Sequence, residues 1–415
     1  MRLALILAAA LAALFASAAP ADASRFVRYG LQDDAWLAYG PGTLDERLDT
    51  LDRMGVTLVR YTLEWNRIEP RKGVPRWEQS DAILRGLQRR GLVPVVTLWG
   101  TPRWANGGRS PNWAPRSKWA LAGFARRAAE RYPFVRSWLI WNEPNQRRWL
   151  RPTSARVYTQ TLLNPAYTAI HRATPGARVG GGVTAPRGAY RGISPVDFIR
   201  GMDGAGAKLD AYAHNPYPLL RFETPTTGGC GHCETITMAT IDRLLREVGK
   251  AFGRKRIWLT EYGYQTNPPD RFLGVSPALQ ARYLAEAAQR AHATPYVDML
   301  IHYLYQDEPD AARWQSGLRT VAGHAKTSHR MAILPLAQAS RTGVRTVLWG
   351  QVRPGQGRQR YVLQQYRSGA WRAVGGVRTT SSGGFLTRTV RAGKGAKFRI
   401  WYPLDRVTSP LVRVS

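Results

Sequence analysis

The chain has 415 residues, 44% of them hydrophobic and 21% charged, which excludes a disordered or fibrous protein and allows a large core without disulfides or metal ions. Its formal charge is +32, because 60 Lys and Arg residues outnumber 28 Asp and Glu residues. Such a charge favours binding to anionic polymers. However, 52 of the basic residues are Arg, a bias that we attribute first to a GC-rich genome, so charge alone assigns no function.

The first 23 residues have the pattern of a secretory signal peptide. A positive Met1-Arg2 start precedes an apolar run over residues 3–15, and the small residues after it include Ala21-Asp22-Ala23. The run is shorter than the ~20 residues that a bilayer requires, and no other segment is long and apolar enough to span one. We therefore expect a protein that is secreted, extracellular or associated with the cell envelope, with no membrane span after the signal is removed.

From residue 24 to residue 340, short apolar segments alternate with amphipathic segments, which predicts parallel strands joined by helices. Eight such units over this length predict a closed (β/α)8 barrel of the TIM type. The strands are expected at Phe26–Tyr29, Leu58–Leu63, Val93–Leu98, Ser137–Trp141, Arg178–Gly182, Leu209–His214, Arg256–Glu261 and Val297–Tyr303. The helices are expected at Leu44–Met54, Gln79–Arg90, Lys118–Arg131, Ser154–Ala173, Ser194–Met202, Ala239–Phe252 and Pro277–Ala291, with a closing segment at Thr327–Ala339.

The pattern changes after residue 340. Residues 341–415 contain short alternating strands between turns rich in Gly and Ser, which predict a small all-β sandwich domain. This domain carries 15 Lys and Arg residues against one acid, Asp405, so its formal charge is +14. Two roles stay open: it covers and rigidifies the barrel, which we favour slightly, or it binds an anionic polymer of the cell envelope. The strands are expected at Arg345–Gln351, Arg360–Tyr366, Trp371–Val377, Phe385–Val390 and Lys397–Tyr402.

The two cysteines of the chain, Cys230 and Cys233, lie in one Cys-Gly-His-Cys segment. A thioredoxin-like redox motif would follow a buried strand at a helix start, whereas this segment follows a loop rich in Thr and Gly. Two thiols and one histidine also lack a fourth nearby ligand for zinc. In an exported chain we expect a disulfide between Cys230 and Cys233 that closes one loop, and no metal site.

Two glutamates fall at the carboxyl ends of predicted strands, where a barrel builds its active site. Glu143 follows the fourth strand in Trp-Asn-Glu-Pro-Asn, and Glu261 ends the seventh in Leu-Thr-Glu-Tyr-Gly. A retaining glycosidase needs two carboxyl groups about 5 Å apart, one to protonate the leaving oxygen and one to attack the anomeric carbon. Strands four and seven lie across the barrel mouth from each other, which allows that spacing. The alternative roles are a helix cap or surface acid for Glu143 and a strand-end ion pair with an arginine for Glu261. Each is credible for one glutamate alone, but the two glutamates together favour a catalytic site.

These two strings resemble those of the large clan of retaining barrel glycoside hydrolases. The clan includes cellulases and mannanases of family five and xylosidases and iduronidases of family thirty-nine. The resemblance covers the barrel, about three quarters of the chain, and leaves out the C-terminal domain. It implies that Glu143 is the general acid/base, that Glu261 is the nucleophile, and that Asn142 hydrogen-bonds the sugar 2-hydroxyl.

The same resemblance implies roles for three further residues. Arg60, on the second strand, would lie near the nucleophile and keep it ionised, since a positive neighbour lowers the pKa of a carboxyl group. His214 and Tyr217 match a pair after the sixth strand, with Tyr217 hydrogen-bonded to the nucleophile. Two alternatives stay open: Arg60 is a surface residue in a chain rich in arginine, or His214 is a buried histidine of the core.

The sequence departs from the commoner clan members at two strand ends. Trp99 ends the third strand, where many members have His, and Tyr303 ends the eighth, where many have Trp. Both positions help to line the subsite beside the nucleophile, so the sugar specificity of no single family transfers to this chain. Among the loop aromatics, Trp149 and Trp314 are the best candidates to stack on the C–H face of a sugar ring.

The sequence contains no P-loop, dinucleotide fingerprint, Ser-His-Asp arrangement or zinc-type histidine cluster, so we expect no cofactor. The expected function is a secreted retaining O-glycosyl hydrolase that cleaves a β-linked polysaccharide or oligosaccharide by double displacement. The alternative is a catalytically silent surface protein on the same barrel that binds glycans or polyanions. Neither hypothesis involves a specific nucleic acid.

Overall fold

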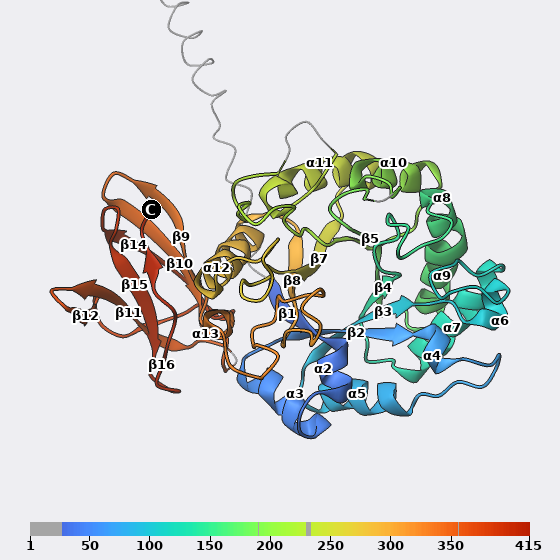
Figure 1. Ribbon diagram of the computed structural model, residues 1–415, viewed down its shortest axis with the longest axis horizontal. Helices are drawn as coiled ribbons and strands as arrows, with labels where there is room; N and C mark the ends of the chain where they lie inside the picture. The colour runs from blue at the N-terminus through green and yellow to red at the C-terminus, as the bar shows by residue number, and fades with distance from the viewer. Residues whose placement is uncertain (1–26, 190, 230–233, 356) are drawn as a thin grey trace, which may run out of the picture.

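Eight parallel strands close into a barrel in the computed structural model, which describes residues 27–189, 191–229, 234–355 and 357–415 (Figure 1). The strands follow one another around the barrel in chain order, which confirms the predicted fold. The expected signal peptide and the expected disulfide between Cys230 and Cys233 lie outside the described residues. The strands are β1 (Arg28–Gln32), β2 (Leu58–Glu64), β3 (Val93–Trp99), β4 (Ser137–Ile140), β5 (Arg178–Thr184), β6 (Ala211–His214), β7 (Arg256–Tyr262) and β8 (Val297–Tyr303).

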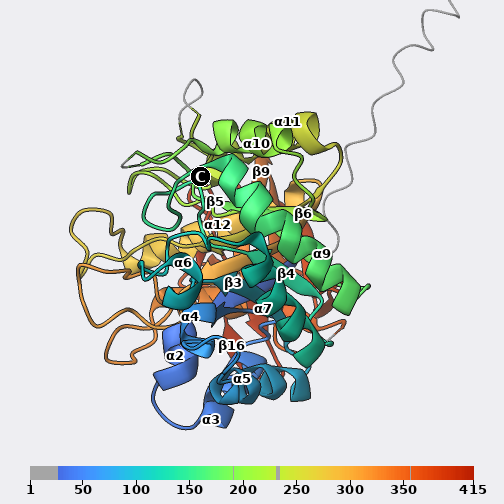
Figure 2. The ribbon, with the colours of Figure 1, turned by 90° about the vertical axis from the view of Figure 1, so that its right-hand side faces the viewer.

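Helices surround the barrel, and Figure 2 shows α7 and α9 side by side on its outer surface. Their starts follow from local sequence: Thr43 and Glu46 form a capping box before α3, and Ser276 caps α12 with Pro277 in its first turn. In the described part of the chain, every helix is too short or too polar to cross a lipid bilayer. The helices are α2 (Asp34–Tyr39), α3 (Leu44–Arg53), α4 (Trp65–Ile68), α5 (Glu78–Arg89), α6 (Arg103–Asn106), α7 (Lys118–Arg131), α8 (Ala155–Val157), α9 (Asn164–Ala173), α10 (Pro195–Gly204), α11 (Ile241–Phe252), α12 (Pro277–Ala293) and α13 (Thr327–Ile333), with a π-helical turn η1 (Tyr158–Leu163) and a 3-10 turn η2 (Met238–Thr240).

A π-helical turn sits in the middle of the helix predicted at Ser154–Ala173. This turn, η1, places the Tyr158 hydroxyl where it donates to the carbonyl of Ile140 at 2.9 Å and accepts from the amide of Gly182 at 3.0 Å. The turn therefore ties the end of β4 to β5, immediately before the segment that carries Glu143.

The barrel interior is filled by apolar side chains. A large residue packs against a small one in this interior: the Trp258 ring on β7 occupies the space beside Gly180 on β5. A Cβ at Gly180 would lie 2.7 Å from Trp258 and 2.8 Å from Leu139, so only glycine fits there. The interior residues are Leu58, Val95, Leu139, Val183, Ala211, Ala213, Trp258, Met299 and Ile301.

The C-terminal domain consists of two antiparallel sheets that enclose their own apolar core, as predicted. One difference concerns the expected closing segment Thr327–Ala339: α13 ends at Ile333, and the residues from Leu336 onward form a strand that pairs with β10. The first sheet contains β9 (Leu336–Thr342), β10 (Arg345–Gln351) and β14 (Phe385–Arg391). The second contains β11 (Arg360–Arg367), β12 (Ala370–Ala373), β13 (Arg378–Thr379), β15 (Lys397–Tyr402), β16 (Val407–Thr408) and β17 (Val412–Arg413).

The first sheet of this domain packs against the barrel at α12. The His292 ring of α12 lies 5.6 Å from Trp349 and 4.5 Å from Phe385, measured between ring centroids. Arg353 extends from the domain over the ring of Tyr29 at 4.2 Å and donates to the carbonyl of Ala332. Barrel and domain therefore share an apolar contact with a stacked cation at its edge.

Candidate active site

A cavity of about 730 Å³ opens at the carboxyl ends of the barrel strands. It receives side chains from the ends or following loops of all eight strands, as expected of a barrel active site. Nine of the ten residues predicted to form the site line this cavity, and His214 does not. The nine are Arg60, Trp99, Asn142, Glu143, Trp149, Tyr217, Glu261, Tyr303 and Trp314.

The Glu261 carboxylate has a fixed donor on each oxygen. Arg60 Nη1 donates to Oε1 at 2.7 Å, and the Tyr217 hydroxyl donates to Oε2 at 3.2 Å. Arg60 is 1% exposed, so it is no surface residue, and its other donors bind the Thr97 hydroxyl and the Asn142 amide oxygen, each at 2.9 Å. Because all three guanidinium nitrogens of Arg60 donate to fixed acceptors, Glu261 is held in one orientation.

Glu143 lies in a strained turn after β4. Trp141 and Glu143 have φ values of 73° and 41°, a region that non-glycine residues rarely adopt, and the Glu143 amide donates to the Val183 carbonyl at 3.0 Å. Such strain persists where the surroundings impose it, typically at functional sites. Asn215 Nδ2 donates to Glu143 Oε1 at 3.1 Å, while Thr260 donates to the Asn215 oxygen at 2.8 Å, which fixes the amide orientation.

The two carboxyl groups have different protonation tendencies. Burial, and then the charge of Glu261, raise the pKa of Glu143 to about 7. Burial also raises the pKa of Glu261, but Arg60 and the hydrogen bond from Tyr217 act against it. Within this coupled pair the contacts of Glu261 favour its ionised form, whereas the raised pKa of Glu143 keeps a substantial fraction of that carboxyl group protonated near pH 7. One neutral and one ionised carboxyl group in the same cavity can act as an acid and a nucleophile.

His214 lies behind the cavity wall instead of in it. Its Nε2 donates to the Ile236 carbonyl at 3.0 Å, and its Nδ1 accepts from the Thr184 hydroxyl at 2.8 Å. Burial lowers the pKa of His214 to about 4, so the ring is neutral. The structure thus supports the alternative of a core histidine, and corrects the expected contact between His214 and substrate, because both ring nitrogens are already used.

Aromatic rings form two walls of the cavity. The Trp99 ring lies 5.5 Å from Trp149 at an interplanar angle of 80°. Trp314 lies 4.8 Å from Tyr217 and 5.9 Å from Tyr303, so it adjoins the residues around Glu261. Rings that line a cavity beside two carboxyl groups suit the flat C–H faces of sugars.

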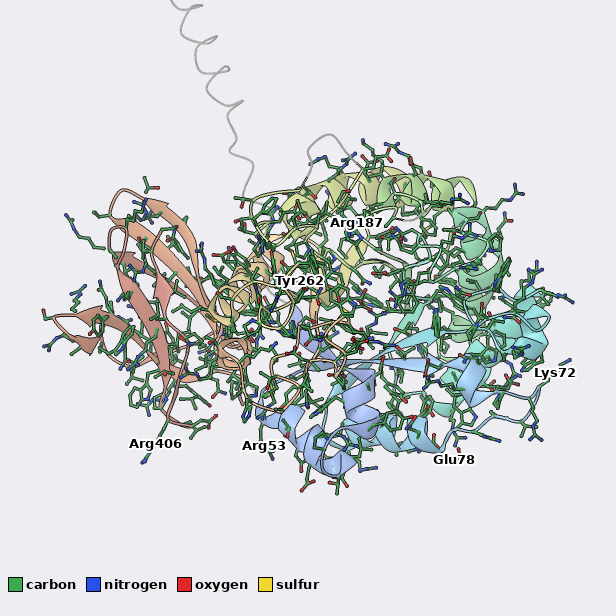
Figure 3. All side chains as sticks on the ribbon, viewed as in Figure 1. Arg53, Lys72, Glu78, Arg187, Tyr262 and Arg406 are labelled. Carbon is green, nitrogen blue, oxygen red and sulfur yellow. The ribbon has the colours of Figure 1, made fainter. Side chains whose placement is uncertain are left out.

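Several polar residues that line the cavity or contact its glutamates escaped the sequence analysis. Asn215 could have been found from the sequence, because it stands between His214 and Tyr217, the two residues that match clan positions after β6. No sequence motif pointed to Asp34. Its carboxylate accepts hydrogen bonds from the amide and the hydroxyl of Thr62 at 2.9 and 2.8 Å. Arg148 and Arg187 also line the cavity, and Figure 3 labels Arg187. Among the described residues, no group of three or more His, Cys, Asp or Glu side chains is placed to hold a metal ion.

The sequence matches no family model and no curated protein. The structure is similar to solved glycoside hydrolases. A family 39 glycoside hydrolase from Bacteroides cellulosilyticus WH2 aligns with a TM-score of 0.63 and 19% identity over 89% of this chain and 80% of its own. A glucosidase from Croceicoccus marinus aligns with a TM-score of 0.59 and 14% identity over 90% of this chain and 94% of its own. A GH39 enzyme from Xanthomonas axonopodis pv. citri aligns with a TM-score of 0.55 and 13% identity over 89% of this chain and 92% of its own. Because the sequence identities are below 20%, this structural similarity establishes a shared fold and nothing more specific.

Proposed function

We propose that this protein is a secreted retaining glycoside hydrolase that cleaves β-linked glycans by double displacement, with Glu143 as acid/base and Glu261 as nucleophile. The observation that carries the proposal is the pairing of Glu261, held by Arg60 and Tyr217, with Glu143, whose pKa is raised to about 7, in one cavity. The glycoside hydrolases with the same fold support a glycan as the substrate.

The reaction proceeds in two steps that use the same two residues. Glu261 attacks the anomeric carbon while Glu143 gives its proton to the glycosidic oxygen, so the glycosidic bond breaks and a glycosyl ester of Glu261 forms. Glu143, now a carboxylate, takes a proton from water as the water oxygen attacks the same carbon and releases Glu261. The configuration at the anomeric carbon is inverted twice and therefore retained.

The neighbours of Glu261 match the charge changes of these steps. Arg60 and Tyr217 stabilise the carboxylate before attack and again when it leaves. Asn142 directs its oxygen to Arg60, which leaves its amide N–H groups to donate toward a sugar hydroxyl. The charge of Glu261 disappears when the ester forms, which removes one cause of the raised pKa of Glu143 and suits its change from acid to base.

The test compares the wild type with Glu261→Ala on a panel of aryl β-glycosides and β-linked oligosaccharides, with azide added to the variant. We expect the variant to lose activity and azide to restore it, with a glycosyl azide as product. Glu286→Ala, a change at an exposed ion pair on α12, serves as the control and keeps full activity. A wild type that hydrolyses nothing on the panel but binds glycans would instead favour the catalytically silent binding protein.

Retention is tested separately from the identity of the nucleophile. Proton NMR of the first product formed from a hydrolysed β-glycoside should show the β-anomer before mutarotation. Appearance of the α-anomer first would overturn double displacement and leave Glu261 as a base for water.

We also propose that the chain is exported and cleaved after residue 23, on the evidence of the small residues there. Expression of the full chain in a bacterial host, followed by amino-terminal sequencing of the protein outside the cells, should give a start at Ser24. Recovery of the whole product inside the cells with Met1 intact would contradict export.

A further inference from the structure

The outer surface of the second C-terminal sheet carries aromatic and basic side chains side by side. This surface lies on β11, β12, β15 and β17, at the end of the molecule that is farthest from α9 (Figure 1). We call it the aromatic–basic face. Its residues are Tyr366, Trp371, Lys397, Arg399, Trp401 and Arg413.

The strand register brings four of these side chains into one row. Residues directly opposite in an antiparallel pair share a face, and here Tyr366 is opposite Trp371 while Lys397 is opposite Arg413. The Lys397 ammonium lies 5.4 Å from the centroid of the Tyr366 ring, which joins the two pairs across β11 and β15. The row therefore crosses four strands at spacings of about 4.8 Å.

A second cation lies beside this row. Arg399 lies opposite Gln364, to which its Nε donates at 2.7 Å, and its guanidinium stands 4.3 Å from the centroid of the Trp371 ring. The neighbouring residues Leu363 and Ile400 point the other way, into the core of the domain. The face is thus the solvent side of the sheet, and Tyr366 is 41% exposed there.

The cations of the face have no acidic partner among the described residues. Lys397, Arg399 and Arg413 enter no ion pair there, and Asp405 is the one acid after residue 340. Arg330 of α13 adds a further positive charge: partial burial, and then Arg330, lower the pKa of Arg399. Like charges held together without counter-charges repel one another, so an anion bound at the face lowers the free energy of the protein.

Packing against the barrel does not account for this face. The apolar contact with the barrel helix α12 lies on the other sheet of the domain, where Trp349 and Phe385 meet His292. Aromatic rings on the solvent side of a sheet increase exposed apolar area, which a domain that only covers the barrel does not need. Figure 3 shows Arg406 projecting outward from the same domain, so its surface is basic beyond the face itself.

We propose that the aromatic–basic face binds an acidic polysaccharide, whose sugar rings contact Tyr366, Trp371 and Trp401 while its carboxylate or sulfate groups pair with Lys397, Arg399 and Arg413. This site is separate from the barrel cavity and does not depend on catalysis there. A polysaccharide fits better than a single-stranded nucleic acid, because successive bases stack on exposed ring faces. The Tyr366 and Trp371 planes are inclined by 63°, so they offer no set of parallel faces on which successive bases could stack.

The test measures binding of the full chain to polygalacturonate by affinity electrophoresis and calorimetry. The protein carries Glu261→Gln so that any hydrolysis in the barrel cannot remove the polymer. We expect the double change Lys397→Gln and Arg399→Gln to weaken binding 10- to 100-fold and to reduce its salt dependence. Trp371→Ala should weaken it about tenfold with the charge unchanged, a loss of the size expected for one stacking contact.

Two controls separate the face from general charge. The double change Arg345→Gln and Arg391→Gln removes two facing cations from the other sheet and should leave affinity within twofold. Polygalacturonate with its carboxyl groups reduced to alcohols should bind at least tenfold more weakly. Equal losses in both double variants would overturn the proposal, since the binding would then follow net charge alone. Tighter binding of single-stranded polythymidylate, lost in the same variants, would overturn it in favour of a nucleic acid.

Discussion

At the scale of single residues, the Glu143 pKa of about 7 sets the upper limit of the pH range for activity. Glu143 must be protonated to act as the acid, so kcat/KM should fall about tenfold per pH unit above that value. In Glu261→Gln the like charge is gone, so the pKa of Glu143 should fall. A pH profile of the wild type and a carbon-13 NMR titration of labelled Glu in the variant measure the two effects. An unchanged Glu143 titration would contradict the coupling.

The hydrogen bond from Tyr217 to Glu261 gives a second prediction. Tyr217→Phe removes a bond to a charged group, which contributes roughly 1.5–3 kcal/mol, so kcat/KM should fall about 10- to 100-fold. The pKa of Glu261 should also rise, which moves the acidic limb of the pH profile to higher pH. Tyr167→Phe removes a similar bond to Asp210, away from the cavity, and should leave both quantities unchanged. A drop in kcat/KM without movement of the acidic limb would assign Tyr217 a structural role only.

At the scale of elements, one buried ion pair holds the loops that follow β7 and β8. Lys326 Nζ donates to the Asp307 carboxylate and to the Thr266 hydroxyl, each at 2.7 Å, and both charged side chains are almost fully buried. Lys326→Met leaves the buried Asp307 carboxylate without a cationic partner, so the free energy of unfolding should fall by about 3–5 kcal/mol.

Chemical denaturation measures this loss, and Arg282→Met provides the matched control. Arg282 pairs with Glu286 on the surface of α12, where an ion pair contributes about 1 kcal/mol or less. Equal effects of the two changes would contradict the importance of burial. Because Trp314 lies on the loop that Lys326 holds, the Lys326 variant should also have a raised KM.

At the scale of the whole molecule, the shared contact at α12 should make barrel and C-terminal domain unfold together. Trp349→Ala removes the ring against His292 and should lower the free energy of unfolding by about 3–5 kcal/mol, with a separate transition for the domain. Differential scanning calorimetry measures both effects. Trp371→Ala changes a ring on the solvent side and should keep a single transition within about 0.5 kcal/mol of the wild type. Two transitions in the wild type would contradict the coupling.

The sequence by itself determined the barrel and the positions of the two glutamates. Alternation of apolar strands and amphipathic helices is a local pattern, and it placed β8 at Val297–Tyr303 and α7 at Lys118–Arg131 with the bounds that the structure has. Since every strand of a (β/α)8 barrel points the same way, a residue at a strand end is also at the mouth. That rule alone brought Glu143 and Glu261 to one cavity.

Tertiary structure decided what depends on residues far apart in the chain. Asn215 meets Glu143 across 72 positions, and Arg60 turned out buried while His214 turned out to lie behind the cavity wall. Leu336–Thr342 forms a strand because β10 is available to pair with it, although a short apolar run fits a helix end equally well. Hydrogen bonds and burial are set by which segments the folded backbone brings together, and no local pattern encodes that.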